Sequence, residues 1–209
     1  MSRVLPILFN AEMVRAILEG RKSCTRKIVK SQQLIGMLPD KCKNGAPEKF
    51  LKEKKLMFKP YCDMTDIELI NTAYKAPYQP GDILYVRETW KKAPNGYYYY
   101  EDWQRNDIAD VTKWKPSIHM PKEAARIWLK VTDVRVERLQ EISAESALAE
   151  GADKYIHTNG GLDENMTITS FIGIWNSTIK KSDIDRYGWD ANPYVWVISF
   201  ERCEKPEGV

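Results

Sequence analysis

The residues of this chain that are best suited to chemistry lie in a short basic segment, residues 20–27, with the sequence Gly-Arg-Lys-Ser-Cys-Thr-Arg-Lys. Such a segment can hold an anionic or polar ligand, because it combines cations with hydroxyl groups. Within it, Lys22 can exchange a proton if burial lowers the pKa of its amine. Thr25 supplies a hydroxyl that becomes a nucleophile beside a base. A solvated basic turn is the alternative interpretation of the same residues.

The element that must position this segment is a helix directly before it. Apolar residues recur at helical spacing between residues 11 and 18. Asn10 is a suitable N-cap, and Gly20 suits the left-handed conformation that often ends a helix. We therefore expect the basic segment to lie at a defined exit from a helix.

A carboxylate partner for Lys22 lies far along the chain. Ser143 is a candidate N-cap and Gly151 a stop signal, which predicts a short helix over residues 144–150. Glu150 then lies in the last turn, where the helix dipole disfavours a carboxylate by several tenths of a kcal/mol. A nearby cation would stabilise it, and Lys22 is the candidate. The sequence alone does not bring the two side chains together.

The remaining patterns predict a mixed fold. Alternation of side-chain type predicts strands, one of them in a hairpin, over residues 4–9, 83–88, 97–100, 127–136 and 195–203. The alternation slips at Thr132 and Asp133, which predicts a bulge or bend of the kind that small barrels use at corners. Helical spacing predicts a further helix from about 167 to 179. These elements favour an α+β fold built on a small β-barrel with flanking helices.

The composition fits a single domain over residues 1–209, since 43% of the residues are hydrophobic. Prolines and glycines repeatedly interrupt residues 31–79, which we interpret as an irregular insertion with short helices. The net charge is only +3, but lysines concentrate between residues 41 and 59. That cluster either attracts a phosphate backbone or forms a solvated helix surface.

Several classes of protein are disfavoured. The four cysteines are widely spaced with no C-x-x-C pair, and there are two histidines, which argues against a structural zinc site. Carboxylates do not cluster as a two-metal mechanism requires, so we expect neither a metal nor another cofactor. No secretory signal or long apolar segment is visible, so we expect a cytoplasmic protein with reduced thiols and no membrane partner.

Cys24 is a rival nucleophile, but on an extended segment it points opposite to Thr25, which favours a buried structural thiol.

Other side chains are candidates for ligand binding. Arg87 falls in an apolar row of a strand, so it needs a partner, either a ligand or a neighbouring acid. His119 could stack on a base or hydrogen-bond to it, or be satisfied within its own loop. Trp189, Asp190 and Asn192 occur just before the last strand, where an aromatic face and an amide could contact a nucleobase edge.

Two segments carry a resemblance to a known family. Residues 20–25 and residues 139–150, Leu-Gln-Glu-Ile-Ser-Ala-Glu-Ser-Ala-Leu-Ala-Glu, resemble the ASCH family, the activating-signal-cointegrator homology domain with a PUA-like barrel. The motif G-R-K-T-x-T of small bacterial N4-acetylcytidine amidohydrolases is similar to the first segment. The resemblance implies amide hydrolysis, with Lys22 activating the hydroxyl of Thr25. Glu150 would aid proton transfer or hold the nucleobase.

The rest of the chain is similar to longer, phage-borne ASCH proteins, through residues 80–90, 116–121 and 187–193. The motif differs at two positions. Ser23 replaces a threonine, and Lys27 stands where the small amidohydrolases carry an arginine, so a bidentate contact is lost. The chain is also considerably longer than the minimal enzyme, so its extra segments could cover or reshape a pocket.

These observations lead to two hypotheses. In the first, the protein hydrolyses an acylated nucleoside such as N4-acetylcytidine, or a related small amide, with Lys22, Thr25 and Glu150 as catalytic residues. Substrate would then be bound by Arg21 and Arg26 together with the candidates Arg87, His119, Trp189, Asp190 and Asn192. In the second, the protein is a non-catalytic module for RNA or single-stranded nucleic acid, or a nuclease, whose cleft holds one unpaired base while the insertion follows the backbone. Both expect a concave site lined by residues 20–27 and Glu150, so the first geometric check is whether Lys22 and Glu150 lie within a few ångströms of each other.

Overall fold

A mixed five-stranded sheet forms the centre of the protein in the computed structural model, which describes residues 2–29, 74–103 and 113–208. The strands lie in the order β1 (Val4–Leu8), β3 (Ile83–Arg87), β6 (Trp128–Arg138), β7 (Tyr194–Cys203) and β2 (Cys24–Ile28). Strands β1 and β3 are parallel and the other neighbours are antiparallel. With the helices around it, the sheet confirms the predicted α+β fold.

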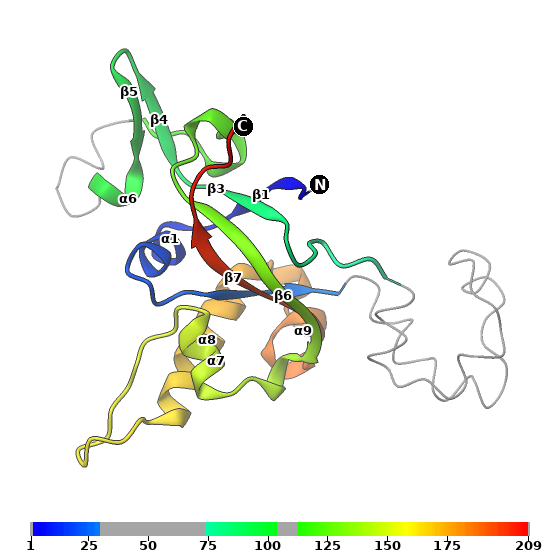
Figure 1. Cartoon of the computed structure of the whole chain (residues 1–209). Coiled ribbons are helices and arrows are strands. Elements are labelled where there is room, and N and C mark those ends of the chain that lie inside the picture. The colour runs from blue at the N-terminus through cyan, green and yellow to red at the C-terminus, as the bar shows by residue number, and fades with distance from the viewer. Residues whose placement is uncertain (1, 30–73, 104–112, 209) are drawn as a thin grey trace, which may run out of the picture.

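The sheet is open, which corrects the expectation of a closed barrel. β1 and β2 stand at its two edges, and no hydrogen-bonded pairing joins them in the part of the chain that the structure describes. Figure 1 shows β6 and β7 crossing the molecule together, with β2 beside β7 and β1 beside β3 at the other edge. Among the described residues, the outer edge of β2 is therefore unpaired and available for other contacts, and we call it the free edge of β2.

The predicted bulge in the long strand is confirmed. The register of β6 against β7 shifts between Val131 and Asp133, where the alternation of the sequence slips. A bulge bends a strand and increases its local twist, so the two halves of β6 contact different parts of the sheet. Its first half pairs with β3, and its second half runs along β7 to Arg138, opposite Tyr194.

The helices begin at the residues that cap them. Asn10 accepts a hydrogen bond from the backbone of Met13 at 2.8 Å, and Ser143 accepts one from Ser146 at 3.2 Å. The predicted helix near residue 167 starts earlier, because Asp163 caps it through the backbone of Met166. The helices in the described ranges are α1 (Ala11–Leu18), α6 (Tyr100–Trp103), α7 (Ala144–Ala149), α8 (Glu164–Thr178) and α9 (Ile184–Tyr187).

Short elements complete the described chain. A hairpin of β4 (Trp90–Ala93) and β5 (Gly96–Tyr99) stands away from the main sheet (Figure 1), and its second strand overlaps the strand predicted over residues 97–100. Single 3₁₀ turns occur at Ser117–His119, Lys122–Ala124, Leu139–Glu141, Lys181–Asp183 and Trp189–Ala191.

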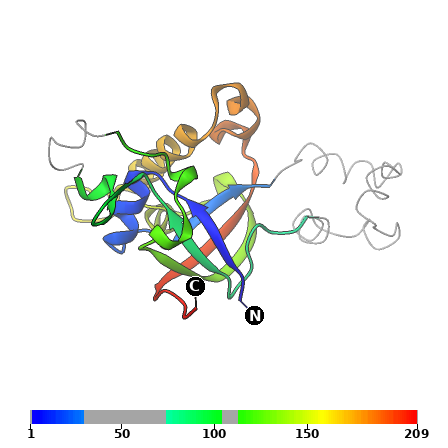
Figure 2. The same ribbon diagram turned by 90° about the horizontal axis from the view of Figure 1, so that it is seen from above.

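The sheet separates two main apolar clusters, and β7 contributes to both. Trp196 and Ile198 pack with α1, β1 and β3 in the first cluster, whereas Val195 and Val197 pack with α7 and α8 in the second. Successive residues of a strand point to opposite faces, so this alternation shows that β7 is buried on both faces. Figure 2, from above, shows the helices distributed around the crossed strands. The candidate site residues of β2 lie beside this doubly buried strand.

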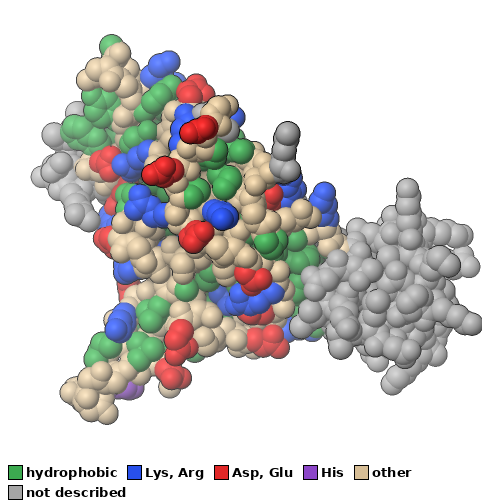
Figure 3. All heavy atoms as spheres, in the orientation of Figure 1, with side chains coloured by type: hydrophobic (Ala, Val, Ile, Leu, Met, Phe, Trp, Pro, Cys, Tyr) green, Lys and Arg blue, Asp and Glu red, His purple; other side chains and the backbone are tan. Residues whose placement is uncertain are grey.

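The surface has no single sign of charge on the face drawn in Figure 3, where basic and acidic side chains are interspersed over the described part. Residues 30–73 lie outside the described residues, so most of the predicted insertion, including its lysine cluster, is not placed. Within the described ranges, none of the helices has both the length and the apolar character needed to cross a bilayer.

Candidate functional site

The basic segment is joined to the end of α7 by backbone hydrogen bonds. Gly20 has a φ of +74°, which turns the chain out of α1. The N–H groups of Arg21 and Lys22 both donate to the carbonyl of Ala16, at 2.8 and 3.0 Å. The next N–H, that of Ser23, donates to the carbonyl of Ala149 at 2.8 Å. The exit from α1 therefore lies against the last turn of α7.

Lys22 and Glu150 meet at this junction, as the resemblance implied. The Nζ atom of Lys22 lies 2.8 Å from Oε2 of Glu150. It also donates to the carbonyl oxygens of Glu150 at 2.7 Å and of Cys24 at 2.9 Å. All three N–H bonds of the ammonium group are thus used, and its side chain is fully buried. The cation also satisfies the carbonyl of the α7 C-cap, where positive charge is favourable.

Arg26 extends the ion pair into a buried cluster. Its guanidinium donates to Oε1 of Glu150 at 3.2 Å and to Oε2 of Glu137 at 3.1 Å. It also lies over the ring of Phe171, 5.7 Å from the centroid. Its Nε has no hydrogen-bond partner among the described residues. We use the name ion cluster for Lys22, Arg26, Glu137 and Glu150.

Gly151 allows the close approach on which this cluster depends. Its φ is +95°, and an added Cβ would lie 3.1 Å from Cβ of Ala16 and 3.8 Å from the side chain of Lys22. We expect Gly151→Ala to lower the free energy of unfolding by about 2 kcal/mol or more, because it adds crowding to the cost of a left-handed side chain. Gly160→Ala is the matched control, since Gly160 has a φ of +86° and nothing within 4 Å. Equal losses in urea unfolding would contradict the crowding argument.

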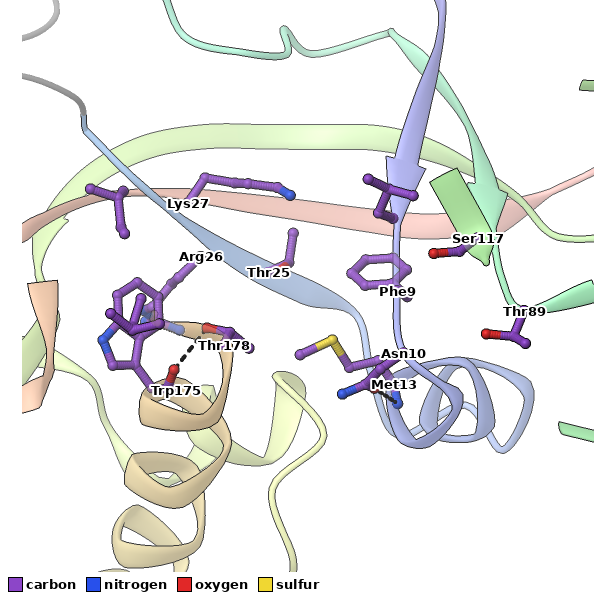
Figure 4. Close-up of a pocket in the computed structure, with 13 residues that line it drawn as sticks. Phe9, Asn10, Met13, Thr25, Arg26, Lys27, Thr89, Ser117, Trp175 and Thr178 are labelled. Atoms are coloured by element: carbon purple, nitrogen blue, oxygen red, sulfur yellow. Dashed lines mark hydrogen bonds between the residues drawn. The ribbon is translucent and has the colours of Figure 1, made fainter. Parts of the chain in front are cut away.

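A pocket of about 480 Å³ opens beside the ion cluster, along the free edge of β2 (Figure 4). Cavities of this size suit small organic ligands. Its walls come from the end of β1, the start of α1, β2, the last turn of α8 and two loops. The lining residues are Leu8, Phe9, Asn10, Met13, Thr25, Arg26, Lys27, Ile28, Thr89, Ser117, Trp175, Thr178 and Ile179.

Thr25 is the hydroxyl that the pocket presents beside a basic side chain. It is buried, and no hydrogen bond to its hydroxyl is formed within the described part of the chain. Thr25 and Lys27 are two residues apart on β2, so both side chains leave the same face of the strand. In Figure 4 both side chains lie at the pocket, with the Lys27 amine directed back along β2. Lys22 and Glu150 do not line this pocket.

The pairing of β2 directs backbone groups toward the same space. The carbonyl of Ser23 accepts from Phe200, and the N–H of Val29 donates to Tyr194. Hydrogen-bonded pairs alternate in an antiparallel ladder, so odd-numbered residues of β2 bond to β7. The N–H of Arg26 therefore points away from β7, to the free edge. It can donate to an oxygen of a ligand beside Thr25.

Cys24 is buried on the other face of β2, as predicted. Its Sγ lies 3.9 Å from the carbonyl of Ser146. Burial raises the pKa of the Cys24 thiol to about 12, and the charge of Glu150 adds to the shift. A thiol in this state is a poor nucleophile.

We expect Cys24 to resist alkylation while the protein is folded. At pH 8 a pKa of about 12 leaves roughly 10⁻⁴ of the thiol ionised, against about 0.1 for the ordinary value of 9.0. In a variant whose other three cysteines are serine, iodoacetamide should react about a thousandfold faster after unfolding in urea. Mass spectrometry measures both rates. Comparable rates in the two states would restore Cys24 as a candidate nucleophile.

Three other predicted binding residues lie outside the pocket. Arg21 is exposed and pairs with Glu19 at 2.7 Å. Arg87 donates to the backbone carbonyls of Met120, at 2.8 Å, and Ile118, so its partners among the described residues are main-chain groups and not an acid. His119 is exposed in the same 3₁₀ turn. Arg87 instead holds the loop that brings Ser117 to the pocket.

The loop before β7 is also separate from the pocket. Trp189 packs edge-on against Phe171 with centroids 6.3 Å apart. Asp190 is exposed, and Asn192 accepts a hydrogen bond from the backbone of Gln140 at 2.9 Å. None of the three candidates lines the pocket, because the loop is bound to the turn after β6.

Sequence reasoning missed several walls of the pocket. The sequence indicated Phe9, Asn10 and Met13 only as parts of a strand and a helix, and Trp175 only as part of the helix predicted over residues 167–179. Trp175 is buried, but it also faces the cavity. The available signal for Phe9, Asn10 and Met13 was their place at the junction of β1 with α1, next to the basic segment in sequence.

Within the described ranges, no group of three or more acidic, histidine or cysteine side chains is arranged to hold a metal ion. The site is thus built from an amine, a hydroxyl, a free backbone edge and aromatic walls. Comparison of the chain with protein-family models, curated proteins and solved structures found no match.

Proposed function

We propose that the protein is an amidohydrolase that removes the acyl group from an acylated nucleoside, such as N4-acetylcytidine, or from a related small amide. The observation that carries this proposal is the Thr25 hydroxyl, which has no partner among the described residues and lies in a pocket beside the Lys27 amine and the free edge of β2. A nucleophile, a basic group and a backbone donor in one cavity are the parts that acyl transfer needs.

In the proposed reaction, Oγ1 of Thr25 attacks the amide carbonyl carbon, and the carbonyl oxygen becomes an oxyanion. The N–H of Arg26 stabilises that oxyanion, as the N–H after a nucleophile does in other hydrolases. Collapse of the intermediate releases the amine and leaves an ester on Thr25. Water then hydrolyses the ester, which returns the hydroxyl and releases the carboxylic acid.

The ion cluster supports this chemistry by positioning β2. Lys22 binds the carbonyl of Cys24, directly before Thr25, and Arg26 directly follows it. Both cations are bound to Glu150. In this proposal Lys22 and Glu150 act through the position and electrostatics of the strand, since neither lines the pocket.

The walls of the pocket fit a nucleobase. Phe9 and Trp175 offer aromatic surfaces, and Asn10 and Thr178 offer polar groups near them. Apolar walls with a few polar groups are typical of sites for small planar ligands. The side-chain oxygen of Asn10 already accepts from Met13 at 2.8 Å, so its amide NH₂ remains to donate to a base.

The same proposal places the chain among the longer ASCH proteins. Its support is that the basic segment and the short helix ending at Glu150, which carry the resemblance, meet in space. The five-stranded sheet would correspond to the PUA-like barrel of that family, left open between β1 and β2.

The direct test is an assay of the purified full chain with N4-acetylcytidine. We expect cytidine and acetate to appear in equal amounts, measured by chromatography. A panel of other small N-acyl amines defines the substrate class. If none is hydrolysed and the protein instead binds single-stranded RNA with an affinity that falls steeply with salt, the nucleic-acid module is supported and the amidohydrolase is rejected.

A further inference from the structure

Lys27 is a basic side chain of the pocket that has no acidic partner in the described part of the chain. It lines the cavity and is half-buried, and no ion pair or hydrogen bond of its amine is formed there. The two neighbouring cations are different, because Lys22 and Arg26 are both bound to Glu150. A half-buried amine without a counter-ion is costly to keep charged, which calls for an explanation at this position.

The position of Lys27 relative to Thr25 suggests the explanation. Both side chains leave the same face of β2, and Figure 4 shows the amine directed back along the strand. Arg26 is the other ionisable residue among those that line the cavity, and its guanidinium is engaged by two carboxylates. Lys27 is thus the lining residue that can exchange a proton with the hydroxyl of Thr25.

The surroundings favour the neutral form of this amine. Burial lowers the pKa of Lys27 below the ordinary 10.5, and repulsion from Lys22 lowers it further. Attraction to Glu150 acts in the opposite direction and is the smallest of the three effects. More of the amine is therefore neutral near pH 8 than for a solvated lysine.

Lys22 does not fit the same role in this geometry. Its nitrogen is fully buried and already donates three hydrogen bonds. A proton acceptor needs a free lone pair, and three acceptors around one nitrogen are satisfied by the ammonium form. In this geometry Lys22 acts as a hydrogen-bond donor, whereas Lys27, which stands where the small amidohydrolases carry an arginine, has no such partners among the described residues.

We propose that Lys27 is the general base of the pocket, and this rests on the proposed amide hydrolysis. The neutral amine takes the proton from Oγ1 of Thr25 as the oxygen bonds to the acyl carbon. The resulting ammonium gives that proton to the leaving nitrogen as the C–N bond breaks, which forms the acyl ester and the free amine. In the second half, the amine takes a proton from the attacking water and returns it to Oγ1 of Thr25.

The first experiment compares wild type, Lys27→Arg and Lys27→Ala in hydrolysis of N4-acetylcytidine. Arginine keeps the charge but cannot accept a proton. We expect kcat/KM to fall about 10²- to 10⁴-fold in Lys27→Arg. Added ethylamine should restore part of the activity of Lys27→Ala, since a small amine can enter the vacated space. Lys130→Arg, on the exposed face of β6, is the matched control and should keep wild-type activity.

The second experiment uses pH. Since the neutral amine is the active form, kcat/KM of the wild type should rise with pH to a plateau, with a midpoint below 10.5. Labelling with acetic anhydride at increasing pH should give the same midpoint for Lys27, below the 10.5 of an ordinary lysine. Circular dichroism checks that each variant is folded.

The outcomes separate the two proposals. Full activity of Lys27→Arg, or a labelling midpoint for Lys27 at or above 10.5, overturns the role of Lys27 and leaves amide hydrolysis intact. Absence of turnover by the wild type overturns amide hydrolysis and the role of Lys27 together. Loss of activity in Lys27→Arg with rescue of Lys27→Ala by ethylamine supports both.

Discussion

Replacing Thr25 by valine is expected to lower kcat on N4-acetylcytidine by at least about 10⁴-fold while the protein stays folded. Valine has nearly the shape of threonine but lacks the attacking oxygen, and loss of a nucleophile removes the covalent route entirely. The free energy of unfolding should change little or rise slightly, because no protein hydrogen bond to the Thr25 hydroxyl is lost within the described chain.

The control for this substitution is Thr169→Val on the exposed face of α8, where the hydroxyl donates to the carbonyl of Asn165. It makes the same chemical change away from the pocket and should retain wild-type kcat. Mass spectrometry provides a second measurement, since an acyl adduct should form on Thr25 in the wild type and be absent from Thr25→Val. Turnover by Thr25→Val at more than a tenth of the wild-type rate would mean that water attacks the substrate directly.

Removing the carboxylate of Glu150 is expected to have the largest effect on stability. Glu150→Ala leaves Lys22 and Arg26 buried beside each other without the acid that binds both. Breaking a buried ion pair in this way costs about 3–5 kcal/mol, a large part of the total stability of a domain. Urea unfolding followed by tryptophan fluorescence measures the loss.

Two further variants show whether the buried charges are the cause. Glu145→Ala removes an exposed carboxylate from the same helix and should cost less than about 1 kcal/mol. Adding Lys22→Met to Glu150→Ala should recover part of the loss, because one uncompensated cation disappears. Additive losses in the double variant would show that the two side chains do not stabilise each other.

Features that depend on neighbouring residues could be predicted from the sequence. The caps at Asn10 and Ser143, the turn at Gly20 and the bulge near Asp133 are each set by a few adjacent residues, and all are confirmed. The expectation of a closed barrel was wrong, because closure depends on whether the two edge strands pair with each other. No local pattern contains that information.

The residues of the candidate site can be separated in the same way, into those that a local pattern indicates and those that depend on contacts between distant segments. The contact between Lys22 and Glu150 was expected through the resemblance, since composition and spacing do not join residues so far apart. The candidates near Trp189 lie outside the pocket, and antiparallel pairing gives the reason. Arg138 at the end of β6 lies opposite Tyr194 at the start of β7, so the loop before β7 must lie beside the turn after β6.

Arg87 shows a different limit of prediction from the sequence. Its position in an apolar row correctly indicated that it needs a partner. The partners are main-chain carbonyls of Ile118 and Met120, and every residue carries such a group, so the sequence gives no means of choosing between them and a ligand. The sequence did not indicate Lys27 as a candidate base, because only the structure shows which basic side chains have acidic partners.

The contact that joins the two halves of the site spans 128 positions of the chain. Closing so large a loop is entropically expensive, so a partly folded chain can contain most of its helices and still lack the assembled pocket. Enzymatic activity should therefore disappear together with global unfolding and return only in the last phase of refolding. A truncated polypeptide that ends before α7 would carry the nucleophile without the acid that anchors its strand.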